Sequence, residues 1–207
     1  GIPPQIYHVH SKIETGYYGR FLAPMFVRTT PDATFIVLDD DILFGSRYFE
    51  NMLRVVKDGF LATRNGRFLN ISNENFGEFD WRGYFSEGPV DTFDEDDEYD
   101  FGGHLWAGKI VWLQAAFRSP PPILSNSEDF WISAALKTIV GVGTKRVRCI
   151  RPQNGGDLEL CACSMKEAGD HVPATVGQEQ VDEDNGARRH AIQAILKQYG
   201  YVPLTSR

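Results

Sequence analysis

A short apolar run that ends in three consecutive acidic residues constrains the fold of this chain most. Residues 34–38 have the sequence Thr-Phe-Ile-Val-Leu, and Asp39, Asp40 and Asp41 follow before the chain turns apolar again at 42–44. An apolar run of this length between turn-forming residues predicts a buried strand. In open α/β sheets, ligands bind outside the carboxyl ends of the strands. The three acids are therefore expected at such an edge.

These carboxylates favour a cation among them, because three like charges side by side repel one another. Hard oxygen ligands on a short turn suit Mg²⁺ or Mn²⁺, which keep open positions for the phosphates of a substrate. The alternative is a solvated acidic turn or a helix N-cap, where Asp is stabilising. The buried strand in front of the acids favours the metal site.

Strand and helix patterns alternate through the first 150 residues. This alternation predicts a single α/β domain with a mixed, mostly parallel sheet flanked by helices. Asn65-Gly66 predicts a type I′ hairpin, and Ser127 is the expected N-cap of a helix. Strands are predicted at 5–10, 34–38, 60–63, 101–107 and 145–150, and helices at 16–28, 47–57, 109–117, 127–138 and 188–199.

The negative charge is concentrated in one segment. The net charge is −7, but residues 71–100 hold eleven acids against one base, and the remainder holds 20 bases against 17 acids. We expect the aromatic first half of 71–100 to be packed, and 91–100 to be solvated and mobile. The mildly basic remainder suits an anionic small molecule. It lacks the dense Lys/Arg patch of a nucleic-acid binder.

No run approaches the ~18 apolar residues that a membrane-spanning helix needs, so no span is expected in this chain. The three cysteines leave the compartment open between the cytoplasm and a secretory lumen.

A second acidic cluster, Glu128-Asp129, follows Ser127 at the expected start of a helix. Because a helix N-terminus stabilises the anion, Asp129 would act more naturally as a base than as an acid. Simple helix capping is the simpler interpretation of the pair from sequence physics alone.

Five segments, in order, resemble one family. Residues 37–42 are similar to the Asp-x-Asp element of nucleotide-sugar glycosyltransferases with the GT-A fold, exostosin-like or family 2-like. Gly19-Arg20-Phe21 is similar to the approach helix of these enzymes, and residues 61–64 to a strand that ends in Arg. Residues 101–106 resemble their acceptor-side strand, and residues 127–133 their Gly-Glu-Asp-x-x-Leu-Ser element, with Ser127 where the family often has Gly. The match spans residues 20–151.

The resemblance implies a metal-dependent transfer of a sugar from a UDP- or GDP-sugar donor to a hydroxyl of a glycan or protein acceptor. Asp39 and Asp41 would hold Mn²⁺ or Mg²⁺ against the donor diphosphate. The base that deprotonates the acceptor, if the configuration inverts, would be Asp129 with Glu128 beside it. The other residues implied on the donor and acceptor side are Arg20, Asp40, Arg64, Gly103, His104 and Trp106.

Only 38 residues precede Asp39, whereas such domains normally begin with a longer strand–helix–strand unit that binds the nucleoside base. We therefore expect residues 1–207 to form one glycosyltransferase domain in which either the base pocket is minimal or the N-terminal unit is incomplete. One alternative is a non-catalytic or fragmentary module that binds sugar or a partner. Another is a glycosidase-like hydrolase that uses paired carboxylates, although three packed acids suit a cation better.

Overall fold

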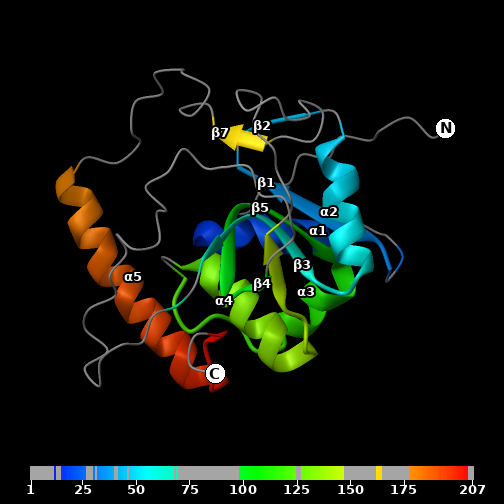
Figure 1. Ribbon diagram of the computed structural model, residues 1–207. Coiled ribbons are helices and arrows are strands. Elements are labelled where there is room, and N and C mark those ends of the chain that lie inside the picture. The colour runs from blue at the N-terminus through cyan, green and yellow to red at the C-terminus, as the bar shows by residue number, and fades with distance from the viewer. Residues whose placement is uncertain are drawn as a thin grey trace.

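The computed structural model of the chain (Figure 1) describes residues 12, 15–26, 30, 32–39, 42–45, 47–67, 69, 98–124, 127–146, 162–164 and 178–204. At 42–44, 65, 67, 104, 146, 162–164 and 178–186 the description covers the backbone alone. The predicted strand at 5–10, Asp40, Asp41 and residues 70–97 of the acidic segment lie outside the described residues.

The centre of the fold is a five-stranded sheet with the strand order β1-β5-β3-β6-β4. Its strands are β1 (Thr34–Leu38), β3 (Leu61–Arg67), β4 (Glu98–Tyr99), β5 (Phe101–Lys109) and β6 (Thr144–Arg146). β5 runs antiparallel to both β1 and β3, and β4 runs antiparallel to β6. Among the described strands of this sheet, only β3 and β6 pair in parallel. The sheet is therefore mixed, and the prediction that it is mostly parallel is wrong.

The order of strands explains this correction. Parallel neighbours need a crossover connection, usually a helix, whereas antiparallel neighbours do not. The sequence between β3 and β5 carries no helical pattern. β5 then runs between β1 and β3 in the direction opposite to both.

The helices surround the sheet. They are α1 (Gly19–Phe26) after the 3₁₀ turn η1 (Gly16–Tyr18), α2 (Tyr48–Lys57), α3 (Ile110–Ala116), α4 (Glu128–Ala135) with the π-helical turn η3 (Leu136–Val140), and α5 (Gln178–Tyr199). In Figure 1, α5 and α2 lie on opposite sides of the view with the sheet between them. A separate antiparallel pair joins β2 (Ile42–Phe44) to β7 (Ala162–Ser164). In the described part of the chain, none of the helices is both long and apolar enough to cross a membrane.

Four of the predicted helices are confirmed to within a few residues, but α5 begins at Gln178 instead of Arg188. A glycine inside a helix destabilises it by only about 1 kcal/mol, so Gly186 does not stop α5. Burial of the later turns supports the helix, because Ala191, Ile192 and Ile195 are buried in the core.

The hairpin predicted at Asn65-Gly66 is also wrong, because β3 continues through both residues and pairs Gly66 with Gly102 of β5. Gly66 serves a different purpose. A Cβ added there would overlap the ring of Tyr99 on β4. Glycine in a strand often marks such a close approach of another group.

Asp100 was expected in a solvated, mobile stretch, but it is 1% exposed. Its carboxylate accepts hydrogen bonds from the backbone N–H of Leu69 at 2.7 Å, the hydroxyl of Tyr201 at 2.9 Å and the backbone N–H of Leu204 at 2.8 Å. A buried carboxylate is tolerated when donors surround it in this way. Asp100 therefore ties the segment after α5 to the start of β5.

Candidate functional site

Asp39 is fixed at the end of β1 by an arginine from α1. Nη1 of Arg20 lies 2.5 Å from Oδ1 of Asp39, and the two side chains are 29% and 23% exposed. The strand delivers Asp39 to this place because Phe35 and Val37 are buried on one face of the sheet. The strand that carries Asp39 is thus anchored in the core, while the ion pair itself stays partly exposed to solvent.

The guanidinium of Arg20 also lies against two aromatic rings. It is 5.6 Å from the ring centre of Trp106 on β5 and 5.8 Å from that of Tyr17 on η1. Trp106 is buried, with its ring edge-to-face against Phe21 of α1 and its indole N–H donating to the carbonyl of Gly102 at 3.1 Å. Cation–π contact and packing together restrict where Arg20 can point.

A β-bulge in β5 determines which of its side chains face this pair. Thr63 pairs with Trp106 and Asn65 pairs with Gly103, so two steps along β3 correspond to three along β5. One extra residue in a strand reverses its alternation. Gly103 and Trp106 therefore share a face, although a regular strand would place residues three apart on opposite faces. None of the described residues comes within 4 Å of the position that a Cβ on Gly103 would take.

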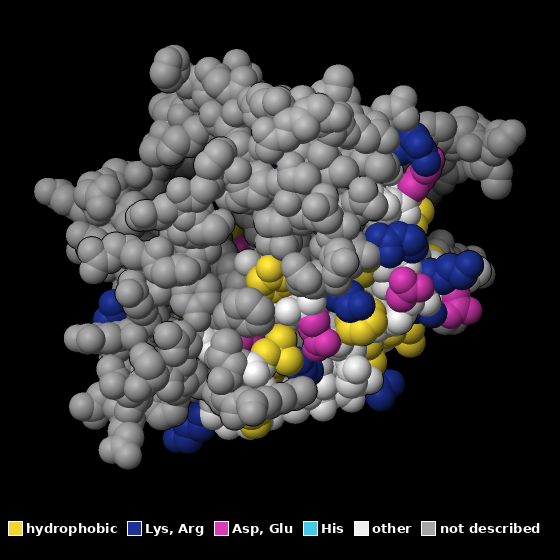
Figure 2. Space-filling model, in the orientation of Figure 1, with side chains coloured by type: hydrophobic (Ala, Val, Ile, Leu, Met, Phe, Trp, Pro, Cys, Tyr) yellow, Lys and Arg dark blue, Asp and Glu magenta, His cyan; other side chains and the backbone are white. Residues whose placement is uncertain are grey.

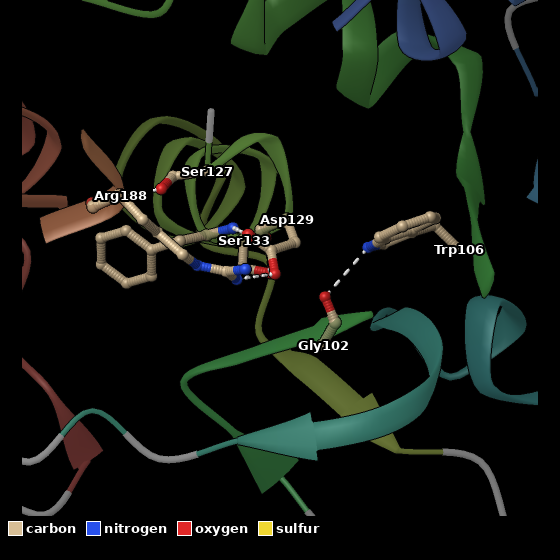
Figure 3. A network of polar contacts seen from close by, with 7 residues as sticks. Gly102, Trp106, Ser127, Asp129, Ser133 and Arg188 are labelled. Carbon is tan, nitrogen blue, oxygen red and sulfur yellow. Dashed lines mark hydrogen bonds and ion pairs between the residues drawn. The ribbon is translucent and has the colours of Figure 1, made fainter. Parts of the chain in front are cut away.

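The second predicted cluster, Glu128-Asp129, opens α4. Figure 3 shows Arg188 reaching from α5 to Asp129, with Trp106 on β5 nearby in the view. Nη2 of Arg188 forms an ion pair with Oδ2 of Asp129, and the backbone N–H of Phe130 donates to Oδ1 at 2.8 Å. Both oxygens of Asp129 are thus held by protein groups.

Ser127 occupies the N-cap position of α4 without capping it. Its φ is +67°, and its side chain makes no capping hydrogen bond. The hydroxyl donates instead to the backbone carbonyl of Arg188 at 3.3 Å. The predicted N-cap position of Ser127 is therefore confirmed, but its side chain helps to hold α5 against the start of α4 instead of capping the helix. A left-handed backbone of this kind is the conformation that glycine adopts most readily.

The carboxyl group of Glu128 has its pKa raised from an ordinary value of 4.5 to about 7. Burial is the main cause and the charge of Asp129 adds to it, while a backbone hydrogen bond, Arg20 and Arg188 act in the opposite direction. Glu128 therefore lies close enough to Arg20 and Arg188 for their charges to lower its pKa. Burial and the charges of Glu128 and Asp129 likewise raise the pKa of the Tyr18 hydroxyl.

The structure thus brings together five predicted residues from four parts of the chain: Arg20, Asp39, Trp106, Glu128 and Asp129. We call these five residues, with Arg188, the charged site. No motif in the sequence marks Arg188, so no role is predicted for it. The available signal was indirect: two adjacent carboxylates need a cation when they are partly buried.

Four other predicted residues cannot be placed in the charged site. Arg64 is buried and follows Thr63 on β3, so it leaves the sheet on the face opposite Trp106. Asp40 and Asp41 lie outside the described residues, as does the side chain of His104.

The described residues contain no group of three His, Cys, Asp or Glu side chains that could hold a metal ion. They contribute Asp39, whose orientation Arg20 fixes. A carboxylate at the end of a strand is the kind of hard oxygen ligand that Mg²⁺ and Mn²⁺ take. Asp41, the second ligand that the sequence predicts, lies outside the described residues, so the metal site stays a prediction.

On the face shown in Figure 2, the described Lys and Arg side chains are interspersed with acidic and hydrophobic ones. No protein-family model matches the chain, and no curated protein matches it significantly. The geometry of the charged site is therefore the basis for a functional assignment.

Proposed function

We propose that this chain is a metal-dependent glycosyltransferase of the GT-A type that moves a sugar from a UDP- or GDP-sugar to a hydroxyl acceptor. One observation carries the proposal. The resemblance names residues on α1, after β1, on β5 and at the start of α4. These residues lie close together in the charged site. Charged side chains with a perturbed pKa that come together from distant segments are a candidate functional site.

The donor would bind on the Arg20–Asp39 side of the site. Asp39 and Asp41 are the residues that would hold Mn²⁺ or Mg²⁺. The bound metal would offset the charge that develops on the departing nucleoside diphosphate. Arg20 keeps Asp39 in one orientation and is itself partly exposed, so its remaining N–H groups are available to the phosphates.

The acceptor would be deprotonated on the α4 side. Asp129 was the first choice as base, but Arg188 and the Phe130 N–H hold its two oxygens. Glu128 suits the role better, because a general base is most effective when its pKa lies near the working pH, and the pKa of Glu128 is about 7. We assign proton transfer to Glu128. Asp129 and Arg188 then act as the pair that positions the start of α4.

The mixed α/β fold supports the proposal without specifying it, since one fold can host many activities. The strand that carries Asp39 lies directly beside the strand that carries Trp106, with Val37 paired to Trp106. This adjacency would place a sugar linked to the diphosphate over β5.

Calorimetric titration of UDP and of GDP, each with and without Mn²⁺, tests the proposal. We expect one nucleotide to bind only with Mn²⁺, and binding to be lost in Asp41→Asn but kept in Lys197→Gln, an exposed change on α5. Metal-independent binding, or equal binding by Asp41→Asn, would exclude the metal bridge. No binding of either nucleotide would leave the donor site without support.

A further inference from the structure

The turn before α1 places two adjacent tyrosines in opposite environments. Tyr18 is 1% exposed and Tyr17 is 52% exposed. Tyr18 packs edge-to-face on Trp131 of α4, with ring centres 5.3 Å apart. The charges of Glu128 and Asp129 help to raise the pKa of its hydroxyl. Tyr17 therefore projects outward from a turn whose other side is anchored beside the proposed base.

The turn is tightly built. Gly16 has φ +53°, a backbone conformation that favours glycine. A Cβ on Gly16 would overlap the carbonyl oxygen of Leu124 in the α3–α4 connection. Close backbone contact and the buried Tyr18 fix η1, so the backbone that carries Tyr17 has a defined place beside Arg20.

Tyr17 also borders the charged site directly. Its ring centre lies 5.8 Å from the guanidinium of Arg20, which bonds to Asp39 and lies near Glu128. An exposed aromatic face beside ionised hydrogen-bonding groups matches the two surfaces of a pyranose ring. The C–H face of the sugar packs on the aromatic ring, and its hydroxyls bond to the charged groups.

We propose that Tyr17 is the stacking platform for a carbohydrate acceptor, which makes a saccharide hydroxyl, rather than a protein side chain, the group that is glycosylated. This assignment rests on the proposed function. A stacked nucleobase fits less well, because a ribose separates the base from its diphosphate, whereas only the Arg20 guanidinium separates Tyr17 from Asp39.

Saturation-transfer NMR with the methyl β-glycosides of xylose, galactose and N-acetylglucosamine tests the platform without any reaction. The samples are the wild type, Tyr17→Phe, Tyr17→Ala and Phe26→Ala, with Mn²⁺ and UDP or GDP added in parallel. Phe26 is a matched control, because it is an exposed aromatic residue at the other end of α1.

We expect saturation of the ring protons of at least one glycoside. The signal should persist in Tyr17→Phe and Phe26→Ala, and fall by about fivefold or more in Tyr17→Ala. An unchanged signal in Tyr17→Ala, or no signal from any glycoside with the wild type, would overturn the platform. Weaker nucleotide binding by Tyr17→Ala would also overturn the platform, because the ring would then contact the donor and not the acceptor. A glycoside signal without nucleotide binding would sink the transferase proposal and leave the platform standing.

Discussion

The guanidinium of Arg20 donates to Oδ1 of Asp39 at 2.5 Å and thereby joins α1 to the residue that directly follows β1. Arg20 is placed for this contact by Trp106, whose ring lies below it. Both partners are about a quarter exposed. The contact is therefore better suited to orienting a carboxylate at the site than to stabilising the fold.

Replacing Arg20 by Met should separate these two roles. Exposed ion pairs contribute about 1 kcal/mol or less, but this pair is part-buried, so the free energy of unfolding should fall by about 1–3 kcal/mol. Nucleotide affinity with Mn²⁺ should fall by about tenfold or more, because a charge-assisted contact is lost. Urea unfolding and calorimetric titration measure the two effects. A large loss of stability with unchanged affinity would make Arg20 a structural residue.

Glu128 should make stability depend on pH. Its pKa is about 7 in the folded protein, above its ordinary value of 4.5, so the folded state binds this proton more tightly than the unfolded state. The corresponding stabilisation is fully present below pH 4.5 and is lost as the pH rises towards 7. Glu128→Gln carries no such proton. Relative to the wild type, it should gain about 3 kcal/mol of stability between pH 4.5 and pH 8.

Denaturant unfolding of both proteins at several pH values measures this gain, and other titrating groups cancel in the difference. Glu50→Gln is a suitable control, since Glu50 is exposed on α2. A difference between wild type and Glu128→Gln that stays constant from pH 4.5 to pH 8 would refute the raised pKa.

Asp100 should be the most destabilising acid to replace among the described carboxylates that lie outside the charged site. Asp100→Ala removes the carboxylate that accepts from two backbone N–H groups and from the Tyr201 hydroxyl, although the hydroxyl keeps its second acceptor, the backbone carbonyl of residue 100, at 3.1 Å. Each buried donor left without an acceptor is unfavourable by about 1–3 kcal/mol, and we expect a total loss of about 3 kcal/mol or more. Thermal unfolding compares it with Asp58→Ala, an exposed acid after α2. Equal stability of the two variants would contradict the buried network.

The sequence predicted best where local patterns and packing agree. The apolar run before Asp39 predicted β1, and helical spacing predicted α1, α2, α3 and the start of α4. Arg20, Asp39, Trp106, Glu128 and Asp129 were all named from the sequence and lie together. Their convergence was implied by resemblance alone, since periodicity does not give distances between elements.

The predictions that were wrong at Gly66 and Asp100 share one cause. Local sequence allows more than one structure there, and contacts with residues far apart in the sequence decide between them. Tyr99 packs over Gly66, so the glycine serves a strand where a turn was predicted. Three donors surround Asp100, so an acid in a charged run is buried. The bulge in β5 could not be predicted either, because it is defined by the register against β3. Arg188 came from a helix that carries no motif.

The role of Gly66 can be tested by rescue. Gly66→Ala should lower the free energy of unfolding by about 1–3 kcal/mol, because the new methyl group overpacks against Tyr99. The double variant Gly66→Ala/Tyr99→Ala should lose less stability than the sum of the two single variants. Additive losses in urea unfolding would show that the Tyr99 ring is not what requires glycine.

The most direct test of the central claim is turnover. UDP- and GDP-sugars are incubated with Mn²⁺ and methyl glycosides, and release of the nucleoside diphosphate is measured. We predict release from at least one donor that EDTA abolishes. Release should fall by about 100-fold or more in Glu128→Gln, and Lys197→Gln should leave it unchanged. No release from any UDP- or GDP-sugar by the wild type, or equal release by Glu128→Gln, would contradict the assignment of the charged site as the centre of a glycosyltransferase.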